Sequence, residues 1–140
     1  MPEPVESLDQ AVEAVTPDAL DLSHRVHATP EVAFQERQAS HWTVELLERH
    51  GFAITAPAGG LDTAFVARWR GSGDGPVVAF AGEYDALPEV GHGCGHNLMC
   101  SSSAGAAIVA SRVLGRDFGG EVRFIGTPAD EAGNGKVYLI

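Results

Sequence analysis

The sequence has little positive charge. Nine Lys and Arg residues stand against 19 Asp and Glu residues, which gives a formal net charge of −10 at pH 7. No Lys or Arg lies between Arg70 and Arg112, and Lys136 is the only lysine. Proteins that bind nucleic acids or anionic membranes use basic surfaces, so we expect neither partner. The acidic composition suits a bound metal ion or serves solubility alone.

The sequence also lacks long hydrophobic runs and a cysteine framework. The longest unbroken apolar runs cover residues 77–81 and 106–110, far short of the roughly 20 residues that span a bilayer. The N-terminus is acidic and does not resemble a secretory signal. Cys94 and Cys100 are the two cysteines. Two thiols without an export signal predict a cytoplasmic protein with no disulfide framework.

The elements that the sequence does contain predict an α/β fold. A length of 140 residues with 44% hydrophobic residues is typical of one packed domain. Helices alternate with short strands, a pattern that predicts a sheet covered by helices. The apolar run at 77–81 predicts a central strand buried on both faces. The expected helices cover residues 5–28 (with a break at Thr16-Pro17), 36–50, 101–114 and 133–140, and the expected strands cover 52–56, 63–70, 77–81 and 121–126.

A glycine-rich loop at 83–97 follows the strand at 77–81 and contains the first candidate site. In α/β sheets, ligands bind where strands end and loops begin. Cys94 and His96 stand two residues apart, and in an extended segment both side chains would point to the same side and reach one metal ion. The alternative is a loop in which the cysteine is buried and the histidine hydrogen-bonds the backbone.

A second candidate site follows the strand at 121–126. Asp130 and Glu131 are adjacent carboxylates at the end of that strand. Metal hydrolases use one carboxylate as a ligand and another to take a proton from water, and adjacent acids could divide these roles. The alternative is an acidic N-terminus of a helix that begins near Gly133.

The two loops together resemble a known family. The sequence is similar to the M20 family of metal-dependent amidohydrolases and peptidases, and within it to the branch that acts on N-acyl amino acids and small dipeptides. Three stretches carry the resemblance: residues 27–31 (HATPE) with Phe34 and Glu36, residues 83–88 (EYDALP) with 91–97 (GHGCGHN), and residues 127–131 (TPADE) with Gly135 and Lys136.

The resemblance implies roles for individual residues. Cys94 and His96 match metal ligands of the family, and Glu131 matches a third. Asp130 matches the general base that activates water. Asp85, and less directly His92, would lie beside the ligands and orient them. We expect no catalytic or metal-binding role for Glu36 or His27. Glu36 is expected to be an acid in the first turn of the second helix, and His27 is expected to lie at the end of the first helix.

The resemblance also implies a cofactor and a reaction. One or two divalent ions, zinc first and manganese or cobalt as alternatives, would assist the hydrolysis of an amide bond in a small substrate. Residues 1–140 would form the N-terminal part of a zinc-exopeptidase-like catalytic domain, without the lid and dimerisation domain that makes full-length relatives homodimers.

Two departures from the family pattern keep other interpretations open. Asp130 stands where the family usually has glutamate, and Asn134 interrupts a run that is often glycine. The shorter aspartate side chain displaces the catalytic oxygen by roughly 1 Å, which can cost about a hundredfold in rate. A truncated, catalytically inactive metal-binding or interaction module is one alternative, and a complete small α/β domain with an incidental Cys/His loop is another.

Overall fold

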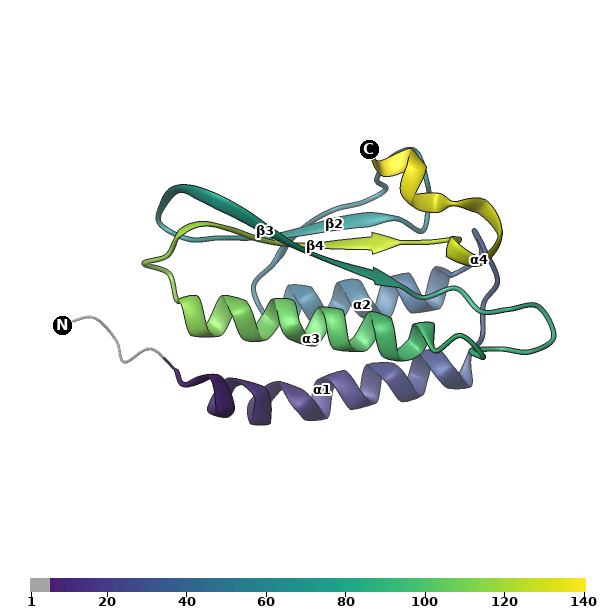
Figure 1. The fold of residues 1–140 in the computed structure, drawn as a ribbon, viewed down its shortest axis with the longest axis horizontal. Helices are drawn as coiled ribbons and strands as arrows, with labels where there is room; N and C mark the ends of the chain where they lie inside the picture. Colours follow the sequence, from purple (N-terminus) through teal and green to yellow (C-terminus); the bar gives the residue numbers. More distant parts are fainter. Residues whose placement is uncertain (1–5) are drawn as a thin grey trace.

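Within residues 6–140, four strands and three long helices form the fold, followed by two short helical turns. The structure is a computed structural model, and it describes residues 6–140 (Figure 1). Along the chain the elements are α1 (Leu8–Ala28), α2 (Arg37–Arg49), β1 (Ala53–Thr55), β2 (Phe65–Arg70), β3 (Gly73–Glu83), α3 (His96–Leu114), β4 (Gly119–Thr127), α4 (Asp130–Gly133) and the 3₁₀ helix η1 (Gly135–Leu139).

The sheet has the strand order β1-β2-β4-β3. β1 pairs with β2 and β2 with β4 in antiparallel fashion, whereas β3 and β4 are parallel. A parallel pair requires a crossover connection, and α3 provides it. The parallel register aligns Glu83 with Thr127, so β3 and β4 end at the same edge of the sheet.

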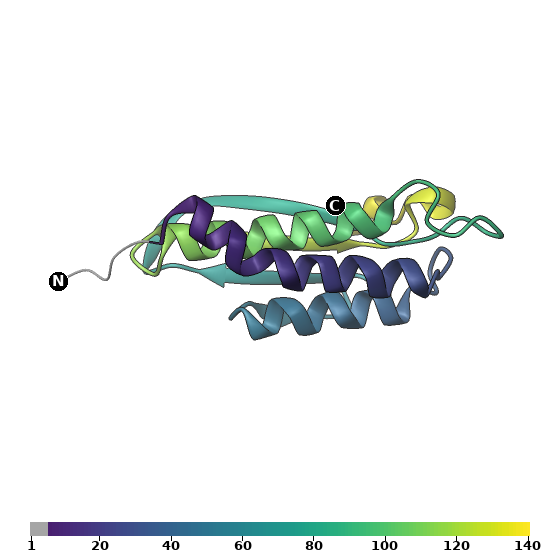
Figure 2. The ribbon, with the colours of Figure 1, turned by 90° about the horizontal axis from the view of Figure 1, so that it is seen from below.

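The three long helices lie on one face of the sheet in two layers (Figures 1 and 2). α2 packs against β1 and β2, and α3 packs against β3 and β4, while α1 lies across α2 and α3. The expected α/β class with a helix-covered sheet is therefore confirmed. The buried core between these layers is mainly aliphatic and aromatic: Val15, Leu22, Val26, Leu46, Leu47, Phe65, Trp69, Tyr84, Ile108, Val122 and Phe124.

The first helix is continuous, and the expected break at Thr16-Pro17 is wrong. Ser7 caps α1 through a capping box with Gln10, so the helix begins at Leu8, and the part of the expected helix that falls on Val5 lies outside the described residues. Pro17 lies within α1, and the Thr16 hydroxyl donates to the Val12 carbonyl. A helix-interior proline costs about 3 kcal/mol, which burial of one face of α1 offsets.

The strand at 77–81 is an edge strand, so the expected central position is wrong. β4 comes later in the chain and inserts between β2 and β3, which leaves β3 with one hydrogen-bonded neighbour among the described strands. Val77 is 53% exposed and Val78 is 45% exposed. Apolar content alone does not distinguish a buried strand from an edge whose side chains face outward.

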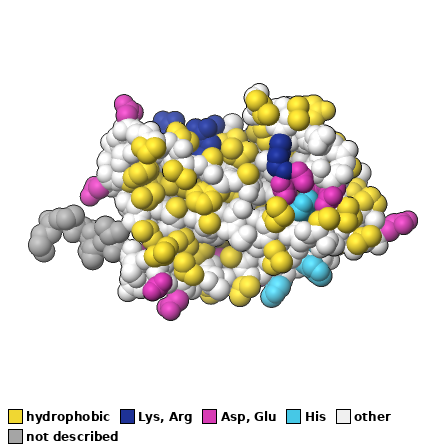
Figure 3. All heavy atoms as spheres, in the orientation of Figure 1, with side chains coloured by type: hydrophobic (Ala, Val, Ile, Leu, Met, Phe, Trp, Pro, Cys, Tyr) yellow, Lys and Arg dark blue, Asp and Glu magenta, His cyan; other side chains and the backbone are white. Residues whose placement is uncertain are grey.

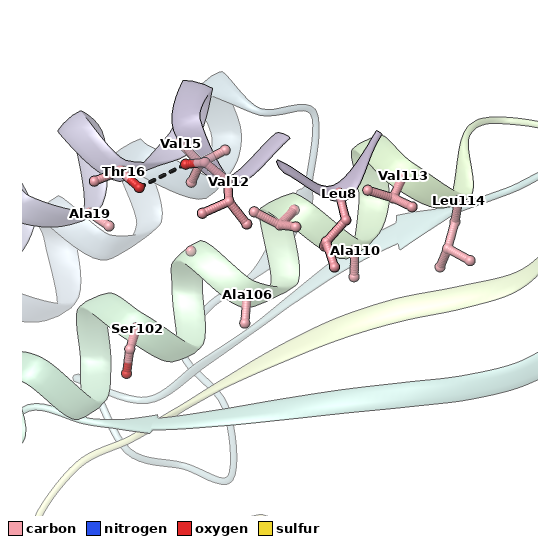
Figure 4. A pocket seen from close by; sticks show the side chains of 12 residues that line it. Leu8, Val12, Val15, Thr16, Ala19, Ser102, Ala106, Ala110, Val113 and Leu114 are labelled. Atoms are coloured by element: carbon pink, nitrogen blue, oxygen red, sulfur yellow. Dashed lines mark hydrogen bonds between the residues drawn. The ribbon is translucent and has the colours of Figure 1, made fainter. Parts of the chain in front are cut away.

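An apolar groove runs between α1 and α3 (Figure 4). It has a volume of about 610 Å³, and Leu8 and Val12 of α1 point toward α3, where Ala106 and Ala110 line the opposite wall. Hydrophobic side chains also spread over the face of the molecule shown in Figure 3. Among residues 6–140, no helix combines the length and the hydropathy that crossing a bilayer requires.

Glu36 is fully buried and joins three segments of the chain. Its carboxylate accepts hydrogen bonds from the Phe34 and Ala129 backbone N–H groups at 2.9 and 2.8 Å and from the Thr63 hydroxyl at 3.0 Å. Phe34 and Ala129 both have positive φ angles. Glu36 therefore fixes two left-handed turns, one before α2 and one before α4, and is not the simple first-turn acid expected from the sequence.

We predict that Glu36→Ala destabilises the fold by about 3 kcal/mol, because it leaves the buried Ala129 N–H and the partly buried Phe34 N–H without an acceptor and creates a cavity. Glu36→Gln keeps one acceptor oxygen for both N–H groups and should cost less than about 1 kcal/mol. Urea denaturation measures both values. Equal destabilisation by the two substitutions would contradict the assigned network.

The same pair of proteins tests the charge of Glu36. Burial raises the pKa of the Glu36 carboxyl above its ordinary value of 4.5, against the opposing effect of its hydrogen bonds. A raised folded-state pKa means that the folded form binds protons more tightly, so wild-type stability falls as the pH rises above 4.5. Glutamine does not titrate. The stability difference between Glu36→Gln and wild type should therefore shrink between pH 4.5 and neutral pH.

The exposed edge of β3 predicts self-association. Val78→Lys should reduce association measured by light scattering, because a charge on an edge strand opposes pairing with another strand. Val90→Lys is the matched control, since Val90 is an exposed valine outside the sheet and the substitution changes the net charge equally. The β3 edge is not the site of association if both variants behave alike.

Candidate metal centre

The candidate site lies where β3 and β4 end. Glu83 is the last residue of β3, and Asp130 and Glu131 begin α4 three residues after the end of β4. Because the strands are parallel, their carboxyl ends bring these side chains to one edge of the sheet. Figure 3 shows acidic side chains gathered there with a histidine and one basic side chain.

His96 is the central side chain of the site. It is the first residue of α3, it is 4% exposed, and it follows Gly95, whose φ of +78° turns the chain into the helix. Its Nδ1 lies 2.9 Å from the Asp85 carbonyl oxygen and 3.1 Å from Asp85 Oδ1. A carbonyl oxygen only accepts, so Nδ1 carries a proton, and the lone pair available to a metal ion is the one on Nε2.

Three carboxylates face that Nε2 atom. Glu83 Oε2 lies 3.3 Å away, Glu131 Oε1 lies 3.6 Å away and Asp130 Oδ2 lies 3.8 Å away. Ligand atoms of Glu83, His96 and Asp130 all lie within 4.8 Å of one another. The structure thus brings Asp130 and Glu131, both singled out in the sequence, to the same nitrogen of His96.

Asp85 connects the parts of the site. Its side chain is buried; Oδ1 faces His96, and Oδ2 accepts a hydrogen bond from the Glu131 backbone N–H at 2.9 Å. One carboxylate thereby orients the imidazole and holds the first turn of α4. The resemblance predicts an orienting role for Asp85, and contacts of this kind set the geometry of metal-binding histidines.

Lys136 lies against the acidic side chains. Its ammonium group donates to Glu83 Oε1 and to Asp130 Oδ1. Burial acts to lower the pKa of Lys136, but Asp130 and Glu83 outweigh it and hold that pKa above its ordinary value. Among the described residues, no other Lys or Arg forms an ion pair with Glu83, Asp85, Asp130 or Glu131.

Cys94 and His96 do not lie in an extended segment, so the expected geometry of this pair is wrong. The left-handed turn at Gly95 separates Cys94 from the helix that His96 begins. Cys94 is exposed, and its hydrogen bond with Glu131 raises the pKa of the thiol. The thiol therefore reaches the site through Glu131, beside the acidic group but outside the tightest cluster.

His92 lies away from these contacts. Its ring packs near the ring of His27, with 6.3 Å between the centroids. Burial lowers the pKa of His92, and His27 adds to this effect. Neither ring nitrogen of His92 has a hydrogen-bond partner within the described part of the chain. The structure does not join His92 to His96 or Asp85 by a hydrogen bond.

The donor set fits a divalent cation. An imidazole nitrogen with a free lone pair faces carboxylate oxygens, the ligand types that zinc and manganese use, and the carboxylates outnumber the one ammonium group. Sequence reasoning assigned no role to Glu83 or Lys136. The signal for Glu83 was its place at the end of a strand, and the signal for Lys136 was its place in the third stretch of resemblance.

Comparisons with known proteins point in the same direction, although no family model matches the chain. The sequence is 35% identical to a p-aminobenzoyl-glutamate hydrolase chain of Escherichia coli over 95% of this chain and 31% of that protein. It is 37% identical to mouse Xaa-Arg dipeptidase over 96% of this chain and 33% of that protein. It is 30% identical to the N-acyl-L-amino acid amidohydrolase of Geobacillus stearothermophilus over 90% of this chain and 37% of that protein.

Solved structures share the fold over a similar length. A dinuclear metal-binding peptidase of the M20 family from Bacillus subtilis superposes with a TM-score of 0.71 at 30% identity, over 85% of this chain and 36% of that one. An aminobenzoyl-glutamate utilization protein from Klebsiella pneumoniae, at 19% identity, shares the fold with a TM-score of 0.68 over 89% of this chain and 39% of that one. The chain spans about a third of the length of the curated relatives it matches. With the His96 cluster at the ends of β3 and β4, these likenesses show that the chain belongs to the M20 family of metal-dependent peptidases and amidohydrolases.

Proposed function

We propose that this chain provides one side of the metal centre of an amidohydrolase that cleaves the amide bond of an N-acyl amino acid or a small dipeptide. One observation carries the proposal. The buried imidazole of His96 is fixed through Nδ1 by Asp85, while its Nε2 faces the carboxylates of Glu83, Asp130 and Glu131. An imidazole oriented in this way is prepared to bind a metal ion.

The proposed ligands are His96, Glu131 and Cys94. Glu83 is a further candidate, because it faces the same nitrogen atom at the shortest distance of the three carboxylates. Zinc is the metal proposed first, with manganese and cobalt as alternatives. A bound divalent ion would polarise the substrate carbonyl and lower the pKa of a water molecule.

Asp130 is proposed as the general base. Its side chain is 36% exposed and lies beside His96, so it is accessible to water and substrate while facing the cluster. Its carboxylate would take the proton of the attacking water and deliver it to the amine that leaves. Asp85 would hold His96 and the Glu131 backbone in place, and His92 enters the proposal only as a neighbour of the site.

The substrate class is proposed from chemistry shared by the relatives. The names p-aminobenzoyl-glutamate hydrolase, Xaa-Arg dipeptidase and N-acyl-L-amino acid amidohydrolase all describe an amide bond that involves an amino acid. A free substrate carboxylate would need a cation, and Lys136 is already paired with two acids. We also propose a reducing, cytoplasmic location, because Cys94 and Cys100 are both free thiols.

We predict that the chain binds zinc and that His96→Gln weakens this binding by more than about tenfold, since even groups that only orient a ligand contribute 10- to 100-fold. His41→Gln is the matched control, because His41 is an exposed histidine paired with Glu45. Calorimetry and elemental analysis give affinity and zinc content. Equal zinc content in the wild type and in His96→Gln would remove His96 from the site.

We predict negligible hydrolysis of p-aminobenzoyl-glutamate or N-acetyl amino acids by the 140-residue chain alone, because it spans a third of its catalytic relatives. Grafted in place of the matching third of the Escherichia coli relative, it should give zinc-dependent turnover. Asp130→Asn should abolish that turnover, and Asp130→Glu should raise it by up to about a hundredfold. A zinc-binding graft that is inactive even with Asp130→Glu would favour the inactive metal-binding module.

A further inference from the structure

Lys136 binds two of the carboxylates that also face His96. Its ammonium group contacts one oxygen of Glu83 and one oxygen of Asp130. The second oxygen of each carboxylate faces His96 Nε2, at 3.3 Å for Glu83 and 3.8 Å for Asp130. The two carboxylates are thus shared between an ammonium group on one side and an imidazole lone pair on the other.

We propose that Lys136 is a resident cation that neutralises Glu83 and Asp130 in the metal-free protein and that a divalent ion displaces its ammonium group on binding. The inference rests on the proposed metal centre. It assigns a function to the only lysine of the sequence, beyond the ligands and the general base.

The charge balance of the site supports this exchange. Four carboxylates converge on His96, and Lys136 is the one Lys or Arg that pairs with any of them in the described residues. Carboxylates this close repel each other unless a cation lies between them. An ammonium group supplies one positive charge and can offer the His96 Nε2 lone pair only a hydrogen bond. A divalent ion supplies two charges and accepts that lone pair.

The local backbone allows the side chain to leave without unfolding the segment. Gly135 lies so close to Pro128 that an added Cβ would come within 1.9 Å of the Pro128 carbonyl oxygen. This close contact, with Asn134 at a φ of +47°, fixes the start of η1. The Lys136 side chain is 44% exposed, so rotation of its flexible stem moves the ammonium group into water while the backbone stays in place.

Displacement of a resident cation reduces the apparent affinity for the metal. Removing the ammonium group should therefore tighten zinc binding, whereas replacing Lys136 with another cationic residue should leave zinc binding unchanged. We expect Lys136→Met to lower the zinc dissociation constant by about fivefold, because a partly exposed ion pair contributes up to about 1 kcal/mol. Lys136→Gln should give the same shift, and Lys136→Arg should stay near wild type. The reference is Arg37→Met, which changes the net charge equally at an exposed ion pair with Asp62.

A second measurement on the wild type separates displacement from a general effect of charge. Because Lys136 is the only lysine, acetylation by a succinimidyl ester followed by mass spectrometry reports on one side chain, with the N-terminal amine as internal reference. At constant pH, saturating zinc should increase the relative acetylation of Lys136 several-fold. His96→Gln should remove this increase.

The outcomes distinguish the inference from the proposed function. Zinc that fails to bind the wild type overturns the proposed function. If zinc binds while Lys136 acetylation stays constant or falls, the displacement is overturned. Equal zinc affinities of Lys136→Met and Arg37→Met would also overturn it. Tighter binding in Lys136→Met together with zinc-dependent acetylation supports it.

Discussion

The parallel pairing of β3 with β4 determines where every side chain of the candidate site lies. Its register aligns Glu83 with Thr127. One strand then delivers Glu83 and the loop that contains Asp85, and the other delivers Asp130 and Glu131. The crossover helix α3 completes the arrangement. A connection between parallel strands must run back along the sheet, so α3 starts at the edge where β3 ends, and His96 is its first residue.

Two buried carboxylates hold this edge together by serving as acceptors for backbone N–H groups. Asp85 accepts from Glu131, and Glu36 accepts from Ala129, so the turn between β4 and α4 is bound on both sides. Ala129 has a φ of +58°, which is a strained conformation for a residue with a side chain. Such a conformation persists only where the surrounding structure fixes it. A carboxyl oxygen can accept more than one hydrogen bond, and Glu36 Oε1 accepts from both Phe34 and Ala129.

The sequence predicted the elements whose signals are local. The apolar spacing around Leu46 and the small residues around Ala107 gave α2 and most of α3, and the strands at β1, β2 and β4 were predicted near their true positions. The position of β3 at the edge was not predicted, because it depends on the insertion of β4, more than 30 residues away. Pro17 within α1 was missed for the same reason, since tertiary packing outweighed the local signal.

For the site, the sequence supplied the residues but not their geometry. Asp130, Glu131, His96 and Asp85 were all identified, and the structure brings them together. Cys94 was expected in line with His96, but that expectation assumed an extended chain where Gly95 turns into a helix. Glu83 and Lys136 were missed, because their importance comes from the register between two strands and from a turn whose conformation cannot be derived from spacing alone.

The strand order has a consequence for how this chain acquires its structure. Among the described strands β4 comes latest in the sequence, yet it lies between β2 and β3 and pairs with both. Until residues 119–127 leave the ribosome, β3 has no partner and β2 has only the three-residue β1. Long-range pairings of this kind form slowly, because the chain loses entropy before the contacts compensate for it. The nascent chain therefore keeps an apolar strand unpaired until residues 119–127 emerge, and unpaired strands of this kind make partly folded chains prone to aggregation.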